Sequence, residues 1–304
     1  MTAETTDTGV PAAAQGPFSL VCDPGIDDMV ALMVLVGAGR PPTRLVATAG
    51  NAELSVTVRN AEAICALLGL HGRVLRGCDA ALTGPYPGWG TEFHGDDALG
   101  GVAGLLPSGP SASRAEPFRA DALDNRILAT SALTPVALAL RGGRRPDVTW
   151  MGGACEVDGN MTAVAEFNAW LDPEAAEEVL RSESCSAMVP LDVTNRVTWS
   201  EQELEALGSH SGIVTAACCQ LRKFGPVALP DVVAAAAFLW PGLFEWRRFH
   251  VTCATGAGPL RGMTDCTPSA RGEVAVAVGL DVPGVKAAVA QSLRNLGEHS
   301  GHGT

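Results

Sequence analysis

The segment 23–28, with the sequence Asp-Pro-Gly-Ile-Asp-Asp, separates two apolar runs near the start of the chain. The apolar residues 18–22 predict a strand and the apolar stretch 29–36 a helix, and the Pro-Gly pair predicts a sharp turn between them. A helix N-terminus favours acidic side chains, but it cannot satisfy three carboxylates that point at one spot. A hard cation with oxygen ligands can, and calcium is the natural candidate. The alternative is that the two later aspartates only cap the helix and the first only ends the strand.

The composition sets broad limits on the fold and on the partners. With 304 residues, of which 47% are hydrophobic, the chain is long enough for a large core, and we expect one domain over 17–297. Residues 1–16 lack the basic start and apolar middle of a signal peptide, so we expect a disordered leader there and a disordered tail at 298–304. The formal net charge of −12 argues against nucleic acid or an anionic membrane surface as a partner. No apolar run reaches the length of a membrane helix.

The cysteines indicate a reducing environment. Their number, 9, is odd, and they are scattered without a CxxC pair. Cys22, Cys155 and Cys218 lie in or beside apolar runs. We therefore expect reduced structural thiols in a cytoplasmic protein.

Strands and helices alternate along the chain. This alternation predicts an α/β fold with a mostly parallel central sheet flanked by helices. The expected strands are 18–22, 44–48, 73–76, 126–130, 148–151 and 187–191; the expected helices are 27–36, 54–68, 135–140, 173–181, 201–207, 212–223, 231–239 and 285–296; a β-hairpin is expected around 250–255 and 273–279. The Gly/Pro-rich stretch 86–113 is a long loop, and loops of that length are more often functional.

Polar residues follow the expected strands at the points where the strands end. Ligands bind outside the carboxyl ends of the strands in sheets of this kind. Carboxylates and amides gathered there suit a ligand with several hydroxyl groups, such as a sugar. The residues in question are Asp23, Asn51, Thr134, Met151, Asn160, Glu166, Asn168, Asp192 and, at the start of a late helix, Asp231.

These motifs together resemble the inosine-uridine nucleoside hydrolase family over nearly the whole chain. The segment 23–28 matches the family signature Asp-x-Asp-Pro-Gly-x-Asp-Asp after its first two positions. Further matches follow in the family's order: Ala49-Gly50-Asn51, Phe93-His94-Gly95, Leu133-Thr134, Met151-Gly152-Gly153, Gly159-Asn160, Glu166-Phe167-Asn168, the stretch 172–176, Pro230-Asp231 and the stretch 261–264. The resemblance implies a Rossmann-like nucleoside hydrolase fold and a homo-oligomer, a dimer or a tetramer.

The resemblance also implies a mechanism. In the family a calcium ion is held by carboxylates that match Asp23, Asp28 and Asp231 and by a main-chain carbonyl that matches Thr134. A water made more acidic by the metal is the nucleophile, and Asp23 is the general base. The ribosyl substrate is expected to contact Asp27, Asn51, Met151, Asn160, Glu166 and Asn168. The transition state resembles an oxocarbenium ion, which a carboxylate-rich site stabilises.

The sequence departs from the family pattern at several positions. Val21 replaces the first aspartate of the signature, and other residues replace those that flank Thr134. Pro230 stands where many members have the histidine that protonates a departing purine, and proline has no donor. Two other histidines, His94 and His250, could replace that donor only if the fold brings them into the site, and His94, in the long loop, is the better candidate of the two.

Three functions remain to be compared on the sequence alone. The first is calcium-dependent hydrolysis of the N-ribosidic bond of a small ribosyl compound, and the second is a calcium-dependent ribose-binding protein without turnover. The intact base Asp23 favours the enzyme. The third, an aspartyl-phosphate phosphatase, requires a second aspartate two residues after the first, and Gly25 occupies that position.

Overall fold

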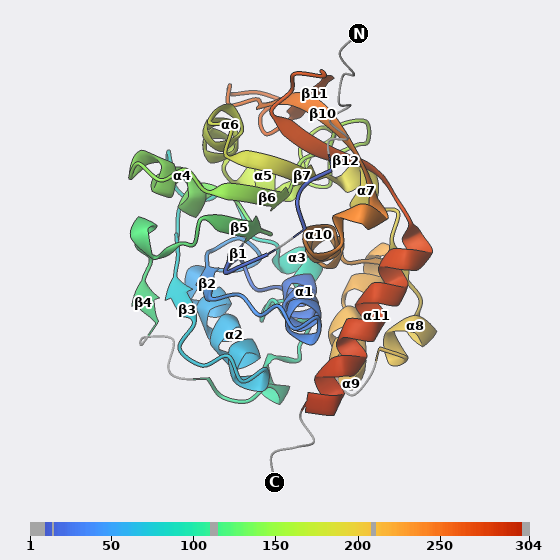
Figure 1. Cartoon of the computed structure of the whole chain (residues 1–304). Coiled ribbons are helices and arrows are strands. Elements are labelled where there is room, and N and C mark those ends of the chain that lie inside the picture. Colours follow the sequence, from blue (N-terminus) through green and yellow to red (C-terminus); the bar gives the residue numbers. More distant parts are fainter. Residues whose placement is uncertain (1–9, 14, 110–114, 208–210, 300–304) are drawn as a thin grey trace.

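A twisted sheet of ten strands forms the centre of the molecule (Figure 1). The computed structural model describes residues 10–13, 15–109, 115–207 and 211–299. The strand order is β11-β10-β12-β7-β6-β5-β1-β2-β3-β4, and all neighbours from β12 to β4 are parallel. The strands are β1 (Ser19–Cys22), β2 (Arg44–Ala47), β3 (Val74–Arg76), β4 (Glu116–Pro117), β5 (Arg126–Ala129), β6 (Asp147–Met151), β7 (Cys185–Val189), β10 (Phe244–Cys253), β11 (Thr264–Pro268) and β12 (Val274–Leu280). The expected α/β fold is therefore confirmed.

Helices cover both faces of the sheet (Figure 1). One apolar cluster joins the sheet to α1, α2, α10 and α11, and a second joins the opposite face to α4 and α6. The helices are α1 (Ile26–Gly37), α2 (Leu54–Leu67), α3 (Thr91–His94), α4 (Thr134–Arg141), α5 (Phe167–Leu171), α6 (Pro173–Arg181), α7 (Leu191–Thr194), α8 (Glu201–Glu205), α9 (Ser211–Cys218), α10 (Pro230–Leu239) and α11 (Val282–His299). A separate two-stranded sheet of β8 (Thr198–Trp199) and β9 (Val227–Ala228) lies outside the main one.

The order of the strands reverses at β1. From β1 the chain adds β2, β3 and β4 on one side, and it then adds β5, β6 and β7 on the other. At such a reversal the connections leave in opposite directions, and the carboxyl ends of the two central strands border a crevice. The segment 23–28 follows β1 at this point, so its carboxylates face the crevice.

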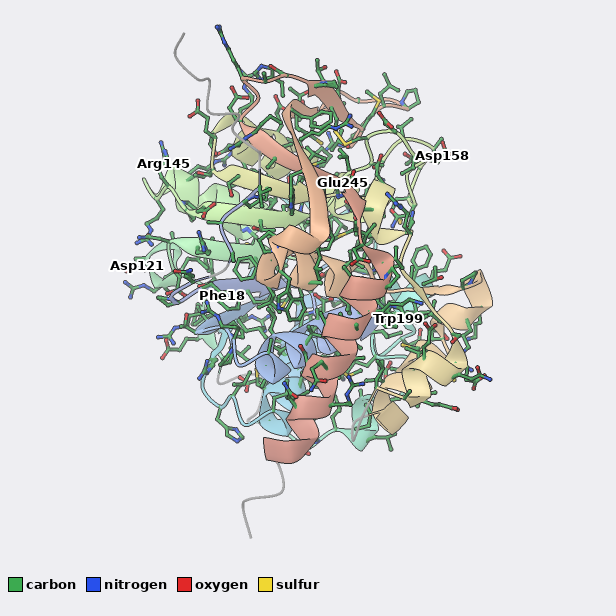
Figure 2. All side chains as sticks on the ribbon, turned by 45° about the vertical axis from the view of Figure 1, so that its right-hand side comes forward. Phe18, Asp121, Arg145, Asp158, Trp199 and Glu245 are labelled. Carbon is green, nitrogen blue, oxygen red and sulfur yellow. A yellow bond between two sulfur atoms is a disulfide. The ribbon has the colours of Figure 1, made fainter. Side chains whose placement is uncertain are left out.

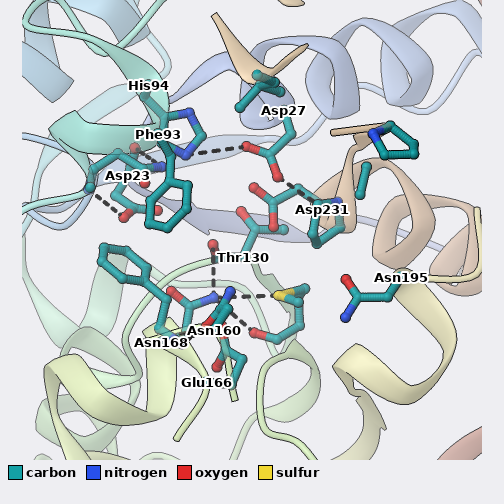
Figure 3. A pocket seen from close by; sticks show the side chains of 18 residues that line it. Asp23, Asp27, Phe93, His94, Thr130, Asn160, Glu166, Asn168, Asn195 and Asp231 are labelled. Carbon is teal, nitrogen blue, oxygen red and sulfur yellow. Dashed lines mark hydrogen bonds and ion pairs between the residues drawn. The ribbon is translucent and has the colours of Figure 1, made fainter. Parts of the chain in front are cut away.

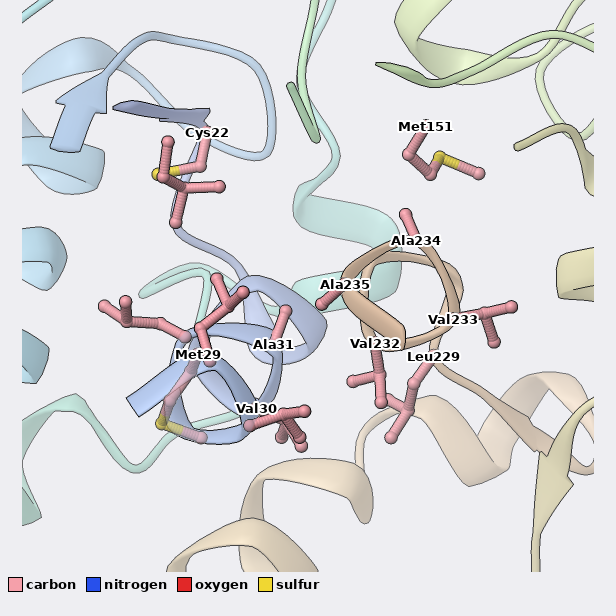
Figure 4. Packing of buried hydrophobic residues seen from close by; sticks show 14 of the residues in the cluster. Cys22, Met29, Val30, Ala31, Met151, Leu229, Val232, Val233, Ala234 and Ala235 are labelled. Carbon is pink, nitrogen blue, oxygen red and sulfur yellow. The ribbon is translucent and has the colours of Figure 1, made fainter. Parts of the chain in front are cut away.

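The helices α1 and α10 pack side by side because their contact faces carry small side chains (Figure 4). Ala31 of α1 and Ala235 of α10 lie between the helix axes and are fully buried. Small residues at a helix contact let the axes approach closely. The N-termini of both helices therefore reach the same end of the sheet, where α1 brings Asp27 and Asp28 and α10 brings Asp231.

Two expectations at the C-terminal end require correction. The hairpin expected around 250–255 and 273–279 is a three-stranded antiparallel unit, because β10 begins at Phe244 and β11 intervenes between β10 and β12. Alternate residues of β10 are buried, which is the pattern of a strand with one covered face. Helix α11 continues to His299, so residues 298 and 299 are helical rather than part of a tail. The remainder of the tail, and most of the leader, lie outside the described residues.

The expectation that every cysteine is reduced was wrong for one pair. Cys155 and Cys266 form a disulfide with a Cα–Cα distance of 5.5 Å, although 111 residues separate them in sequence (Figure 2). The disulfide connects β11, which contains Cys266, to the segment that follows β6, which contains Cys155. The other cysteines are free, and most of them are buried. Sequence spacing could not indicate this pair, because the sheet alone brings the two segments together.

Within the described residues, no helix is both long and apolar enough to cross a membrane.

Candidate active site

The turn after β1 directs a buried carboxylate back over the start of α1. Asp28 accepts hydrogen bonds from the main-chain N–H of Gly25 at 2.9 Å and from the hydroxyl of Thr130 at 2.8 Å. The side-chain amide of Asn51 donates to the same carboxylate at 3.2 Å. Three strand ends, those of β1, β2 and β5, therefore hold Asp28 in one orientation.

Asp23 is fixed in a similar way by the turn after β2. The main-chain N–H of Asn51 donates to Oδ2 of Asp23 at 2.8 Å, and the Asn51 amide donates to the Asp23 carbonyl at 3.0 Å. Gly90 lies against the other side of Asn51, where a β-carbon would be 2.6 Å from the amide oxygen. The chain passes so closely here that only glycine fits.

Asp27, Asp28 and Asp231 form the tightest acidic cluster among the described residues. One carboxylate oxygen from each lies within 4.8 Å of those of the other two, and all three side chains are buried. Burial and the charge of Asp27 raise the pKa of Asp28 to about 7, and they also raise the pKa of Asp231. Burial and the charge of Asp28 raise the pKa of Asp23, which lies beside the cluster. Buried carboxylates this close repel one another unless a proton or a cation lies between them.

The ends of β5 and β6 supply the opposite side of the site (Figure 3). The amide nitrogen of Asn168 donates to the Met151 carbonyl at 3.0 Å, which fixes the side chain. Its amide oxygen, Oδ1, is buried and has no hydrogen-bond partner. A buried acceptor without a donor is costly, so a hydroxyl group of a ligand would satisfy it.

Glu166 caps the short helix α5 from within the site. Its carboxylate accepts from the main-chain N–H groups of Gly153, Asn168 and Ala169 at 2.9 to 3.1 Å. Despite these donors, burial raises the pKa of Glu166 to about 7. Asn160 lies nearby, where its side-chain oxygen accepts from the N–H of Phe167.

His94 is held in one tautomer. Its Nδ1 accepts a hydrogen bond from the N–H of Ile26 at 3.1 Å, so the ring proton of the neutral imidazole resides on Nε2. Nε2 faces Asp27, 4.0 Å from Oδ1. Burial lowers the pKa of His94, and the charge of Asp27 opposes that shift only in part.

These residues surround a cavity of about 370 Å³. That volume lies within the range of small-molecule sites. The lining contains most of the residues expected from the sequence: Asp23, Asp27, Asn51, His94, Met151, Asn160, Glu166, Asn168 and Asp231. Asp28 lies directly beneath the surface, where it contacts Asn51 and Thr130. The structure thus brings these distant segments together.

Thr134 does not reach the cavity. Its hydroxyl donates to Asp172 at 2.6 Å and lies 2.9 Å from the Tyr86 hydroxyl, on the far side of the turn after β5. Thr130, the residue directly after β5, lines the cavity instead and contacts Asp28. Thr130 directly follows a strand, which is where site residues are expected in such sheets. The resemblance of Leu133-Thr134 to the family pattern predicted Thr134 instead, four residues further along the chain. Asp192 is also outside the lining, and it holds the segment after β6 through the N–H groups of Cys155 and Glu156.

Apart from Pro230, the sequence interpretation missed one side of the cavity, which we name the outer wall. It consists of residues from the C-terminal end of α7 and from the segment leading into α10: Asn195, Leu221, Pro226, Ala228 and Pro230. Phe93 and Phe167 complete the lining beyond the polar residues. Pro230, Phe93 and Phe167 belong to motifs that the sequence analysis singled out, but no local pattern marks the other four positions, because only the tertiary fold brings their segments together.

The comparisons with known proteins agree with this geometry. The profile of the inosine-uridine preferring nucleoside hydrolase family matches residues 19–287. The chain belongs to this family. It is therefore an N-glycosyl hydrolase of the nucleoside hydrolase class.

Proteins with similar sequences or folds come from different organisms. An uncharacterized protein of Schizosaccharomyces pombe is 34% identical over 277 residues, which cover 81% of this chain and 82% of the relative. The pyrimidine-specific ribonucleoside hydrolase RihA of Shewanella sp. strain ANA-3 is 30% identical over 272 residues, covering 82% and 85%. The purine-preferring ribonucleoside hydrolase from Gardnerella vaginalis shares the fold with a TM-score of 0.82 at 24% identity, over 92% of this chain and 99% of that one.

Proposed function

We propose that this nucleoside hydrolase cleaves the N-ribosidic bond of ribonucleosides with the help of a calcium ion bound among its aspartates. One observation carries the proposal: a buried cluster of carboxylates faces an unsatisfied amide acceptor, Asn168 Oδ1, across a cavity large enough for a nucleoside. A cation and a polyhydroxylated ligand satisfy both features at once. The family membership supplies the reaction class.

The donor set suits a hard cation. The proposed ligands are carboxylate oxygens of two cluster members, Asp28 and Asp231, and of Asp23 beside the cluster. The main-chain carbonyl of Thr130 is proposed in place of that of Thr134, and the third cluster member, Asp27, is assigned to the sugar. All are oxygen atoms, and calcium prefers oxygen ligands in flexible geometry. Calcium bound there would lower the pKa of a water molecule and would fix the ribose hydroxyls. Burial and the neighbouring carboxylates raise the pKa values of Asp28 and Asp231, so a bound cation would relieve the repulsion that otherwise favours protonation.

Asp23 is the proposed general base. The N–H of Asn51 occupies Oδ2 and fixes the plane of the carboxylate. Oδ1 then accepts the proton from the attacking water as the bond to C1′ of the ribose forms. A positioned base of this kind contributes about a hundredfold or more to a rate.

The remaining polar residues are proposed to hold the sugar. Asp27, Asn51 and Asn168 bind ribose hydroxyls from two sides, and Asn160, Glu166 and His94 make further contacts with the sugar. Met151 packs beside the ring. As the bond to the base breaks, positive charge develops on the ribose, and the surrounding carboxylates stabilise it.

A nucleoside panel tests the proposal. We expect ribose release from at least one ribonucleoside or from 4-nitrophenyl riboside with calcium present. The release should stop with a chelator and return when calcium is restored. Binding of ribosides without release would indicate the ribose-binding alternative, and release that ignores the chelator would contradict the metal assignment. A cytoplasmic location and a homo-oligomeric state stay predictions, to be examined by fractionation and by light scattering.

A further inference from the structure

Asn160 differs from most of the other proposed sugar contacts in how it is held. Asn51, Glu166 and Asn168 are buried, whereas Asn160 is exposed and lines the cavity from an irregular part of the chain. We name residues 155–164 the Asn160 segment, and each of them is exposed or half-buried. A stretch with few buried contacts is easily displaced. Specific anchors therefore have to determine where Asn160 lies.

Strand β11 holds the beginning of the Asn160 segment. The hydroxyl of Thr264 accepts a hydrogen bond from the N–H of Ala154 at 2.9 Å and donates one to the carbonyl of the same residue at 2.8 Å. The next residue, Cys155, forms the disulfide with Cys266 of the same strand (Figure 2). These contacts fix the chain as far as Cys155, but they leave open the direction that it takes from there.

Asp192 supplies a second anchor from a different element, the helix α7. Its Oδ2 accepts from the N–H of Cys155 at 2.9 Å, and its Oδ1 accepts from the N–H of Glu156 at 2.7 Å. Hydrogen bonds to a charged acceptor are about twice as strong as those between neutral groups. The neighbours of Asp192 on α7, Leu191 and Val193, are buried, so the helix is a firm support. Asp192 therefore sets the direction of the chain from Glu156 towards Asn160.

The remainder of the Asn160 segment folds back on itself. The N–H of Gly159 donates to the Ala163 carbonyl at 3.3 Å, and a β-carbon at Gly159 would lie 2.2 Å from the carbonyl oxygen of Ala165. Oδ1 of Asn160 accepts from the N–H of Phe167 at 2.9 Å. The amide nitrogen of Asn160 carries two N–H groups from which a sugar hydroxyl can accept. The position of these donors depends on the anchors at both ends of the segment.

We propose that Asp192 is a positioning residue for the hydrolysis. It lies outside the cavity lining and does not touch the substrate; it fixes Asn160 against the sugar through the N–H groups of Cys155 and Glu156. The inference rests on the proposed function, because the sugar contact of Asn160 belongs to that proposal. It gives a role to an aspartate that follows a strand end without entering the cavity.

The effect of Asp192 should fall on the sugar and not on the leaving group. The polar residues proposed to hold the sugar occupy the other walls of the cavity, so the mostly apolar outer wall is left for the released base, the aglycone. A displaced Asn160 weakens the hold on the sugar whatever the aglycone is. One hydrogen bond between neutral groups is worth up to about tenfold in affinity.

The experiment is a double-mutant cycle in the full-length calcium-loaded protein, without a reductant so that the disulfide stays intact. Asn160→Ala should lower kcat/KM for 4-nitrophenyl riboside about tenfold. Asp192→Ala should lower it by up to the same factor. The double variant should be no worse than Asn160→Ala alone, because Asp192 acts through a side chain that is then missing. Asp192→Asn, which keeps one acceptor oxygen, should lie between Asp192→Ala and wild type.

Asp281→Ala is the matched control. Its carboxylate also accepts a main-chain N–H, that of Gly284, and it lies outside the cavity lining, so this variant should behave as wild type. Amide hydrogen exchange tests the contact without a substrate. Exchange at Cys155 and Glu156 should be faster in Asp192→Ala and unchanged in Asp281→Ala.

Three results would overturn the proposal. Losses that add in the double variant would show that Asp192 acts elsewhere in the fold. Wild-type kcat/KM in Asp192→Ala, or in Asn160→Ala, would remove one of the two links. Unchanged exchange at Cys155 and Glu156 would remove the contact. If the wild type cleaves no riboside, the proposed function itself is refuted, and the same cycle is then measured on the affinity for ribose by calorimetry.

Discussion

The carboxylate of Asp23 lies so close to Gly50 that a β-carbon at position 50 would be 1.9 Å from Oδ2. Gly50 follows β2 and Asp23 follows β1, and these strands are neighbours in the sheet. The absence of a side chain at position 50 therefore determines where the proposed base resides. The turn after β2 thus fixes the position of the carboxylate that is proposed to accept the proton.

Gly50→Ala should displace the Asp23 carboxylate and reduce kcat about a hundredfold, since a shift of about 1 Å in a reacting group costs that much. Thermal unfolding should change little by comparison with activity. Gly256→Ala, at a position with no neighbouring atom within 4 Å, is the matched control and should behave as wild type. Wild-type kcat in Gly50→Ala would contradict the assigned role of Asp23.

Calcium should raise the melting temperature, and more at pH 8 than at pH 5. Burial and mutual repulsion raise the pKa values of Asp28 and Asp231, so protons compete with the metal at low pH. At a calcium concentration of about a hundred times Kd the gain is about 2.7 kcal/mol. Asp231→Ala should abolish the calcium response without unfolding the metal-free protein, because it removes one repelling charge. Asp265→Ala, at an exposed acid, should retain the response.

Asp23→Asn should lower kcat far more than it weakens binding of the substrate. The amide cannot accept the proton of the attacking water, and loss of a general base costs about a hundredfold or more. Steady-state kinetics on the best nucleoside, with isothermal titration of a ribose analogue, separates the two effects. Asp158→Asn, which changes an exposed acid, is the control. Equal rates in Asp23→Asn and wild type would exclude the mechanism.

Pro230→His should increase the turnover of inosine more than that of 4-nitrophenyl riboside. General acid catalysis helps most where the leaving group is most basic. Pro230 occupies the first position of α10, where the missing N–H has no helical partner, so the substitution should cost little stability. In the wild type, inosine should be a poor substrate and the nitrophenyl compound a good one. High and equal wild-type rates on both would point to another acid, with His94→Ala as the next variant.

Glu166 should make a pH-dependent contribution to stability. Its pKa is about 7 in the folded protein, against an ordinary value of 4.5. A raised carboxyl pKa means that the folded state holds the proton more tightly, so this contribution is present below pH 4.5 and is lost as the pH rises to about 7. The melting temperature of Glu166→Gln relative to wild type should therefore rise across that window. Glu156→Gln, at an exposed position, should show no such trend. A flat difference for Glu166→Gln would contradict the raised pKa.

The sequence predicted the fold and the charged half of the site because both depend on local patterns. Apolar runs bounded by turn residues located the parallel strands, and polar residues at their ends located Asp23, Asn51 and Glu166. What it missed depends on contacts between distant segments. Thr130 rather than Thr134 faces the cavity because the turn after β5 directs Thr134 towards Asp172. Asn195 and the Cys155–Cys266 disulfide arise from tertiary packing, which no spacing in the sequence encodes.

The separation of the cavity into a charged half and an apolar outer wall has a consequence for how such proteins diversify. The charged residues stand at strand ends and at the starts of α1 and α10 and contact one another, so a substitution there disturbs several partners at once. The outer wall belongs to connecting segments beside α7 and α10, and its side chains do not hold the charged residues in place. Successive exchanges at Asn195, Leu221, Pro226 and Ala228 would give a lineage new substrates while the bond-breaking chemistry is inherited unchanged. A combinatorial library confined to these positions should therefore change which substrates are cleaved while the bond-breaking chemistry stays the same.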